Sequence, residues 1–384
     1  MEEEWSKISR SVRLRWVGCY NCAKDCHQAI RYPGRQLYFH KCYSKLTYLM
    51  AAYEDLKFNY DILGVTQEYG LDGFSTPQVL AFAVELYEAG ILTDDDLPGF
   101  PPDAAGRFFY LIEKIVRREG VGDALANGVW WAARQIGKGA EEFDHNTVKK
   151  HEQMPIKLAH VSYPYFLMYA TGEKVGITQI EGSFPQAPQP DIEERKRLVE
   201  GWVAAPERFK KWFLEWEPRT NPSIEASVNI VDWNETMHYI DDAIGMCAFL
   251  SSFKGQSGCR PPYHLYNLPT FISLATGLDL DPDSLWEIGS RNRQLLRAIN
   301  VRRGLRRIDE KPPEDHWKKR EPEMEQKLLD AYYEFKGWNS DGIPTKETLD
   351  KLGLGYVAED LIQRGILPGN EGTPSTEILA AAKN

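Results

Sequence analysis

The sequence lacks several features that mark common classes of protein. No apolar run reaches the roughly 18 residues that a membrane-spanning helix needs, and no glycine-rich phosphate loop follows a predicted strand. Basic residues are in deficit, because 46 Lys and Arg stand against 56 Asp and Glu; the formal charge of −10 argues against binding to nucleic acid or an anionic membrane. The acidic start (Glu2, Glu3 and Glu4) has no signal-peptide core. These absences predict a cytoplasmic protein without a membrane span.

Cysteine is also scarce, and its distribution is more informative than its number. Six cysteines in 384 residues do not make the disulfide framework of a secreted protein. Three of them form the run Cys19-x2-Cys22-x3-Cys26, and thiolate is the soft ligand that iron–sulfur centres prefer. A zinc knot, a disulfide scaffold and unconnected buried thiols are the alternatives. Because three thiolates leave one corner of a [4Fe–4S] cluster open, we expect the fourth ligand to be Cys247.

The pattern of apolar residues predicts a mainly α protein. Apolar side chains recur at helical spacing along much of the chain, for example at Phe82, Ala83 and Leu86. Capping residues, glycines and prolines mark the ends of these segments, as Asp281 and Pro282 do before the helix that follows them. Helices are predicted over about 46–63, 77–89, 104–118, 123–136, 192–215, 223–252, 282–300, 325–336 and 345–352.

The chain is long enough for two or three domains. The helical pattern loosens between 146 and 155, which predicts a cluster-binding domain over 1–150 and a second helical domain over 151–384 that supplies the last cluster cysteine. The segment 156–192 is rich in aromatic residues and proline, so we expect a long loop that lines a cavity rather than a core element.

Further blocks follow the cysteine run in a fixed order, over 69–76, 81–87, 118–123, 137–142, 242–247, 275–277, 300–302, 332–333 and 337–345. Through these blocks nearly the whole chain resembles the tungsten–pterin aldehyde ferredoxin oxidoreductases. The resemblance implies the helical second and third domains of that fold. Since 18 residues precede Cys19, the family's N-terminal β domain is expected to be absent. That domain would then lie on a separate partner chain, or this chain would be the remnant of a split gene.

The resemblance also implies two cofactors. A [4Fe–4S] cluster would be held by Cys19, Cys22, Cys26 and Cys247. A tungsten (or molybdenum) bis-molybdopterin would be shared with the chain that supplies the N-terminal pterin-binding domain. A ferredoxin-like protein or subunit is the implied electron-transfer partner.

Two Asp-x-x-Gly-Leu motifs grip the pterins in this family. The second is present, with Asp242 facing the pterin and Met246 in place of Leu, while Asp241 is expected to be an ordinary carboxylate on the helix surface. The first begins with Gln67 in place of Asp; an amide can hydrogen-bond a pterin but brings no negative charge. The implied cofactor-binding residues are Gln67, Gly70, Leu71, Asp72, Asp242, Gly245 and Met246.

Two departures from the family pattern bear on the chemistry. Typical aldehyde-oxidising members carry a Glu near the position of Cys42 and a His near that of Thr178. Cys42 looks instead like a thiolate ligand to tungsten, as in the benzoyl-CoA reductase branch, whose catalytic subunit reduces an aromatic ring; a buried structural thiol is the alternative. His40 and His151, with Glu152, are candidates for proton relay, and ordinary hydrogen-bonded side chains are the alternative for each.

The expected function is that of an oxidoreductase subunit in anaerobic metabolism. It would transfer electrons between the ferredoxin-like partner and a small organic substrate, with an aromatic acyl-CoA as one implied class. Aldehyde oxidation to carboxylate is the alternative among enzymes. A non-catalytic iron–sulfur subunit, serving electron transfer or as a scaffold, is the alternative from another class.

Overall fold

The computed structural model describes residues 2–22, 25–40, 56–152, 163–173, 191–200, 222–247, 261–311 and 321–368, with four single positions between 207 and 214. The chain divides into two units. Unit 1 comprises Met1–Lys157 with Pro312–Lys318, and unit 2 comprises Leu158–Lys311 with Lys319–Asn384. The domain boundary expected at residue 150 stays a prediction.

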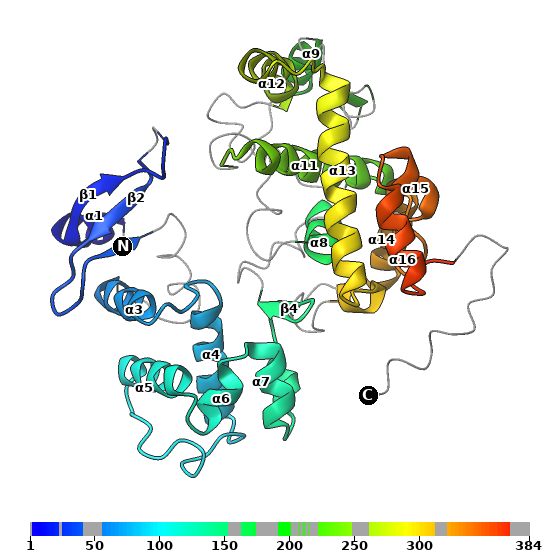
Figure 1. Ribbon diagram of the computed structural model, residues 1–384. Coiled ribbons are helices and arrows are strands. Elements are labelled where there is room, and N and C mark those ends of the chain that lie inside the picture. Colours follow the sequence, from blue (N-terminus) through cyan, green and yellow to red (C-terminus); the bar gives the residue numbers. More distant parts are fainter. Residues whose placement is uncertain are drawn as a thin grey trace. The chain divides into compact units, whose positions relative to one another are not determined.

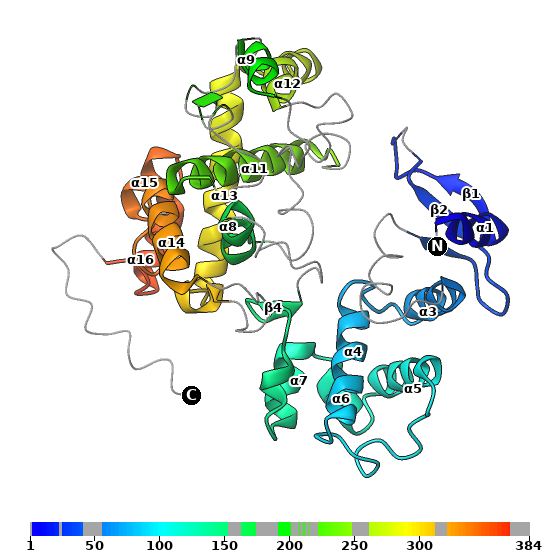
Figure 2. The same cartoon turned by 180° about the vertical axis from the view of Figure 1, so that it is seen from behind.

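Helices dominate both units, which confirms the expected mainly α fold (Figures 1 and 2). The described residues form fourteen α-helices, while their strands are two to five residues long. None of the described helices combines the length and the apolar character that a membrane crossing requires.

Unit 1 begins with a small sheet that the sequence analysis did not predict. Helix α1 (Glu2–Val12) leads into an antiparallel sheet of order β1-β2-β3, in which Ala29 of β2 lies opposite both Arg15 and Phe39. The remaining elements of unit 1 are helical apart from one hairpin. The elements are β1 (Arg13–Val17), β2 (His27–Ile30), β3 (Tyr38–His40), α3 (Leu56–Glu68), α4 (Ser75–Glu88), α5 (Ala104–Arg117), α6 (Val121–Leu125), α7 (Val129–Ile136), η1 (Ala140–Phe143), β4 (Thr147–Val148) and β5 (His151–Glu152).

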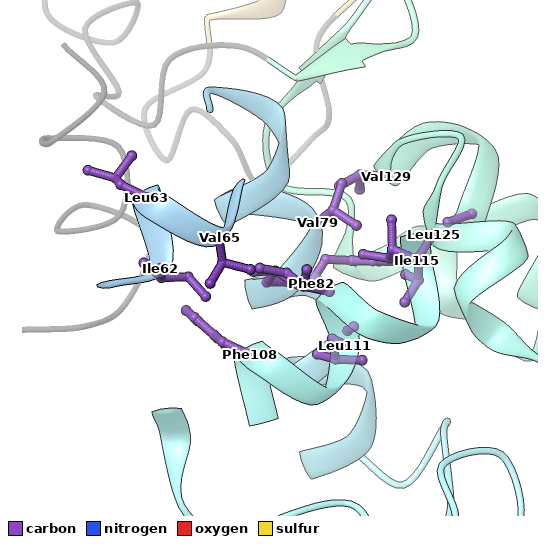
Figure 3. Close-up of a cluster of buried hydrophobic side chains, with 14 of the residues drawn as sticks. Ile62, Leu63, Val65, Val79, Phe82, Phe108, Leu111, Ile115, Leu125 and Val129 are labelled. Atoms are coloured by element: carbon purple, nitrogen blue, oxygen red, sulfur yellow. The ribbon is translucent and has the colours of Figure 1, made fainter. Parts of the chain in front are cut away.

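The core of unit 1 lies between α3, α4 and α5. The apolar stripe predicted on α4 is confirmed, because Phe82, Ala83 and Leu86 are buried. Figure 3 shows Phe82 close to Phe108 and Leu111 of α5, so the two helices bury their apolar faces against each other. This packing fixes the positions of the helices that the loops of unit 1 connect.

The helix predicted over 123–136 is wrong as one element. It is divided into α6 and α7 at Gly128, whose φ of 93° is left-handed. A Cβ at Gly128 would lie 2.8 Å from Oε1 of Glu152, and this same oxygen accepts a 2.6 Å hydrogen bond from the backbone N–H of Val129. The carboxylate of Glu152 therefore accepts a backbone N–H that has no partner within α7, and it has room to do so because Gly128 has no side chain.

Unit 2 is built around two long helices that cross, α11 (Ile224–Ile244) and α13 (Pro282–Arg302) (Figure 1). Asp281 caps α13 by accepting the N–H of Ser284 at 2.7 Å, as the sequence predicted. Where they cross, a Cβ on Gly289 would lie 2.8 Å from both the Cγ2 and the backbone oxygen of Thr236. The other elements are α8 (Tyr163–Thr171), α9 (Ile192–Glu200), α12 (Pro261–Thr276), η4 (Arg307–Glu310), α14 (Pro322–Lys336), α15 (Lys346–Lys351) and α16 (Gly355–Gln363).

The long loop expected over 156–192 is wrong in part. Helix α8 occupies Tyr163–Thr171, and its residues from Phe166 to Thr171 are buried. The aromatic content of this stretch therefore serves the core of unit 2. The prolines that suggested a loop mostly follow the helix, in a stretch outside the described residues.

Helix α11 is buried on all sides, because residues 226–241 are all shielded from solvent. Two of them are carboxylates that meet cations from other helices. Nζ of Lys336 lies 2.9 Å from Oδ1 of Asp232 and 2.5 Å from Oε1 of Glu235. Nε of Arg293 lies 2.7 Å from Oε2 of Glu235, and the hydroxyl of Tyr332 donates to the same carboxylate at 2.7 Å.

The charge network continues from Arg293 to the end of α8. Oε1 of Glu173 lies 3.0 Å from Nη1 of Arg293 and 2.9 Å from Nη1 of Arg297, and all three side chains are fully buried. Nη1 of Arg297 also lies 2.5 Å from Oε1 of Glu310, and Oε2 of the same carboxylate accepts a hydrogen bond from the hydroxyl of Tyr333. We call these residues with Asp232, Glu235, Tyr332 and Lys336 the buried charge network.

The carboxylates keep the buried cations charged. Burial alone lowers the pKa of Lys336, but the carboxylates of Glu235 and Asp232 outweigh it and raise that pKa above its ordinary value. Burial raises the pKa of Tyr332 well above its ordinary value, so its hydroxyl remains a donor to Glu235. Because each charge is compensated locally, removal of one partner leaves another charge buried alone.

We predict that Glu235→Gln lowers the free energy of unfolding by about 3–5 kcal/mol, since Arg293 and Lys336 lose their shared carboxylate while the side-chain volume is kept. The matched control is Arg364→Met, which removes an exposed ion pair with Asp360 in the same unit. This variant should change the free energy of unfolding by less than about 1 kcal/mol. Urea unfolding of both variants measures the difference. Equal effects would contradict a structural role for the network.

Candidate functional site

The described residues of the cysteine run, 18–22 and 25–26, lie between β1 and β2, and the first of them form a tight turn. The backbone N–H of Cys22 donates to the carbonyl of Cys19 at 2.9 Å. Asn21 and Asp25 have left-handed φ values of 56° and 48°. A Cβ on Gly18 would lie only 2.5 Å from the carbonyl oxygen of Cys22, so the loop closes onto a position that has no side chain.

The chemistry of this loop fits a thiolate-held cluster. Cys19 is exposed, whereas Cys22 and Cys26 are half-buried, so the run lies at the surface of unit 1. Cys247 is exposed on unit 2. Among the described residues no three His, Cys, Asp or Glu side chains are gathered closely enough to hold a metal ion. The set of four cysteine ligands therefore stays a prediction, supported by the donor type and the curl of the loop.

The two pterin motifs share one backbone conformation at the ends of two helices. At the end of α3, Gly70 is left-handed, with a φ of 68°, and the N–H of Leu71 donates to the carbonyl of Thr66 at 2.9 Å. At the end of α11, Gly245 has a φ of 70°, and the N–H of Met246 donates to the carbonyl of Asp241 at 2.8 Å. Both ends are Schellman caps, which is why each motif requires glycine at this place.

The side chains of the first motif bind the protein's own backbone. The amide of Gln67 pairs with both the N–H and the carbonyl of Phe39. Oε1 of Glu68 accepts the N–H of Gln36 at 2.9 Å. Oδ1 of Asp72 accepts the N–H groups of Phe74 and Ser75 at 3.0 and 2.6 Å, at the start of α4. The expected cofactor contacts of Gln67, Gly70, Leu71 and Asp72 stay predictions.

The second motif presents its side chains outward. Met246 and Cys247 are exposed, and Asp242 is exposed in the last turn of α11. Asp241, which was expected to be the surface carboxylate, is buried instead, so that expectation is wrong. The expected cofactor contacts of Asp242, Gly245 and Met246 stay predictions.

Of the candidate catalytic residues, His40, His151 and Glu152 lie within the described part of the chain. Cys42 and Thr178 lie outside the described residues, and His40 ends β3. His151 is exposed in β5. Glu152 is buried and, as described above, accepts the N–H of Val129 at the start of α7, which gives it a structural role. Their catalytic roles stay predictions.

The buried charge network was missed by the sequence analysis, although three of the sequence blocks belong to it. Tyr332 and Tyr333 donate to Glu235 and Glu310. The carbonyl of Gly342 accepts the Nε–H of Arg297 at 2.7 Å, and Asn300 donates to Glu173 at 2.6 Å. The signal for these residues was present as the blocks over 300–302, 332–333 and 337–345 that carry the family resemblance, but a block alone does not reveal burial.

Residues 2–354 match the family profile described as aldehyde ferredoxin oxidoreductase, domains 2 and 3. The tungsten-containing aldehyde ferredoxin oxidoreductase of Thermococcus kodakarensis is 26% identical over 369 residues, which are 92% of this chain and 55% of that protein. The aliphatic sulfonate oxidoreductase, WOR-like subunit, of Pyrococcus furiosus is 26% identical over 315 residues, which are 77% of this chain and 42% of that one.

A solved structure is more similar. The active site complex BamBC of benzoyl coenzyme A reductase in complex with 1,5-dienoyl-CoA contains a chain that is 55% identical. The two superpose with a TM-score of 0.87, over 96% of this chain and 57% of that one. This chain thus spans about half the length of the proteins it matches.

We predict that Gly245→Ala lowers the free energy of unfolding by about 1–2 kcal/mol, because alanine is strained at a φ of 70° although nothing lies within 4 Å of the added methyl group. The control is Gly355→Ala at the start of α16, where φ is not left-handed and the added methyl group would meet only Oδ1 of Asp350, at 3.2 Å. That variant should be neutral or slightly stabilising. Thermal unfolding of the two variants measures the difference. If Gly245→Ala left the stability unchanged, the left-handed cap at Gly245 would be refuted.

Proposed function

The chain belongs to the aldehyde ferredoxin oxidoreductase family, as its sequence blocks predicted, and we propose that it is part of an oxidoreductase that reduces an aromatic acyl-CoA. The observation that carries this proposal is the 55% identity, over 96% of the chain, with a benzoyl-CoA reductase chain. The identity with an aldehyde-oxidising relative is 26%. The absence of the Glu expected near Cys42 agrees with this preference.

The reaction adds two electrons and two protons to the ring. One π bond of the aromatic ring is lost, two C–H bonds form, and a 1,5-dienoyl-CoA results. The electrons come from a ferredoxin-like donor, which is oxidised, and the protons come from water through acidic side chains. When bound, a tungsten bis-pterin and a [4Fe–4S] cluster would supply the low-potential electron transfer that this ring demands.

The chain's own residues would hold these groups and shape their surroundings. Cys19, Cys22, Cys26 and Cys247 are the proposed cluster ligands, since thiolates are the donors such clusters take. The exposed end of α11 would face the pterin through Asp242, Gly245 and Met246. Because the buried charge network fixes α11 at Asp232 and Glu235, and residues 226–241 of the helix are all buried, the direction of this end is set before any cofactor arrives.

The proposed catalytic residues have two roles, which are to bind the metal and to hold protons. Cys42 would bind tungsten through its thiolate, and His40 and His151 would hold protons for the ring. Their proposed partners are a chain that carries the pterin-binding domain and a ferredoxin-like electron carrier. The proposal places the protein in the cytoplasm of an anaerobic cell.

The cluster assignment predicts the iron content. Purified without oxygen together with the chain that carries the pterin-binding domain, and freed of the ferredoxin-like carrier, the protein should contain about four iron atoms per copy of this chain and stoichiometric tungsten and pterin. Cys22→Ser and Cys247→Ser should each lose iron, whereas Cys259→Ser, a control outside the proposed ligand set, should keep it. Elemental analysis measures all four proteins. Iron without tungsten would support a scaffold subunit and contradict the enzyme.

The substrate assignment predicts the activity of the same preparation. Oxidation of a 1,5-dienoyl-CoA with a dye as electron acceptor regains aromaticity, so it should proceed readily, whereas aldehydes should be turned over poorly. Cys42→Ser should abolish this turnover and leave the iron content unchanged, since Cys42 is not a proposed cluster ligand. Unchanged turnover in Cys42→Ser would refute its role, and faster oxidation of aldehydes would favour the aldehyde-oxidising alternative.

A further inference from the structure

Within the described residues, β3 is an edge strand, because the sheet has the order β1-β2-β3. In an extended strand the N–H and the carbonyl of one residue point to the same side, so Phe39 presents both groups together at one edge. An edge strand leaves such groups without a strand partner, and they need another one. Phe39 lies three residues before Cys42 in the sequence.

The side chain of Gln67 supplies the missing partner. Its Oε1 accepts the N–H of Phe39 at 3.3 Å, and its Nε2 donates to the carbonyl of the same residue. The side-chain amide of Gln67, near the end of α3, thus makes the two hydrogen bonds that the backbone of a fourth strand would make with Phe39.

The contacts next to this pair hold the same segment to the same helix. Oε1 of Glu68 accepts the N–H of Gln36 at 2.9 Å, and Nε of Arg35 lies 2.5 Å from Oδ1 of Asp61. The buried hydroxyl of Tyr38 donates to the backbone of α3, at Tyr60, at 2.6 Å.

A glycine in α3 makes this approach possible. A Cβ on Gly64 would lie 3.2 Å from the side chains of both Arg35 and Tyr38. The residues from Arg35 to Phe39 are therefore attached along the C-terminal half of α3, and of the contacts named here the Gln67 pair lies closest in sequence to Cys42.

The chemistry of position 67 decides between an amide and a carboxylate. An amide can donate and accept at once, which the N–H and the carbonyl of Phe39 both require. The Asp of the family motif can only accept, carries a charge that would face the carbonyl oxygen of Phe39, and is one methylene shorter. Gln67 therefore suits a task that the family's Asp cannot perform.

We propose that Gln67 is a positioning residue, which fixes the strand leading to Cys42 through the backbone of Phe39 rather than binding the pterin. The inference deepens the proposed function and rests on it only for the effect on turnover. The attachment itself is a property of the chain, and it can be measured whether or not a cofactor is bound.

The test is Gln67→Asp in the complex purified without oxygen, because this variant restores the residue of the family motif. Hydrogen exchange of peptides covering 38–40 should become faster, by roughly three- to tenfold at Phe39, as expected for the loss of one net hydrogen bond or two. Gln135→Asp, the same change at an exposed position of α7, is the control and should leave this exchange unaltered. Unaltered exchange in Gln67→Asp would overturn the proposal.

Turnover and cofactor content supply the second readout. With tungsten and pterin content unchanged, kcat for dienoyl-CoA oxidation should fall about tenfold or more, since small misplacements of a reacting group are costly, while KM stays within about twofold. Loss of pterin or tungsten, or a gain in turnover, would show that position 67 acts on the cofactor and would overturn the proposal. If the unaltered protein has no such turnover, the proposed function fails, and the exchange measurement alone decides the role of Gln67.

Discussion

The burial of charge along α11 is the constraint on which unit 2 depends. A buried carboxylate is tolerated when a cation and further hydrogen bonds compensate it. Glu235 meets this requirement through Arg293, Lys336 and Tyr332, which come from two other helices. Because these partners must all reach one carboxylate, the helices have little freedom to slide. The helix that carries the Cys247 motif is therefore held along its length by interactions that do not involve that motif.

The same network explains why particular residues of the sequence blocks are buried, among them Tyr332, Tyr333, Trp338 and Gly342. Trp338 lies against both arginines, with its ring centroid 4.9 Å from the guanidinium carbon of Arg293 and 4.2 Å from that of Arg297, and Gly342 leaves room for Nη2 of Arg297. These residues serve the fold of unit 2. The thiols of Cys19 and Cys247 are exposed on their units, and side chains of that kind are the ones a cofactor could cover.

Sequence reasoning predicted features that depend on local rules and missed those that depend on distant contacts. The start of α13 follows from Asp281 and Pro282, since a cap is formed by neighbours in the sequence. Burial of Arg293 and Arg297 could not be predicted, because a charged residue in a helix is ordinarily exposed and its partner at Glu173 is more than a hundred residues away. The sheet of unit 1 was missed because β3 has three residues, too few for a periodic signal.

The backbone cap at the end of each motif explains why the motif requires a particular residue at one position and tolerates different residues at another. Glycine is required at positions 70 and 245 because the backbone is left-handed there. The residue three places earlier contributes its carbonyl to the cap, at Gln67 as at Asp242, so the cap itself does not use its side chain. At Asp242 that side chain is exposed at the helix end, and at Gln67 it pairs with the edge of β3. One backbone conformation can therefore support two uses of its leading residue, and a shared motif does not by itself establish a shared ligand.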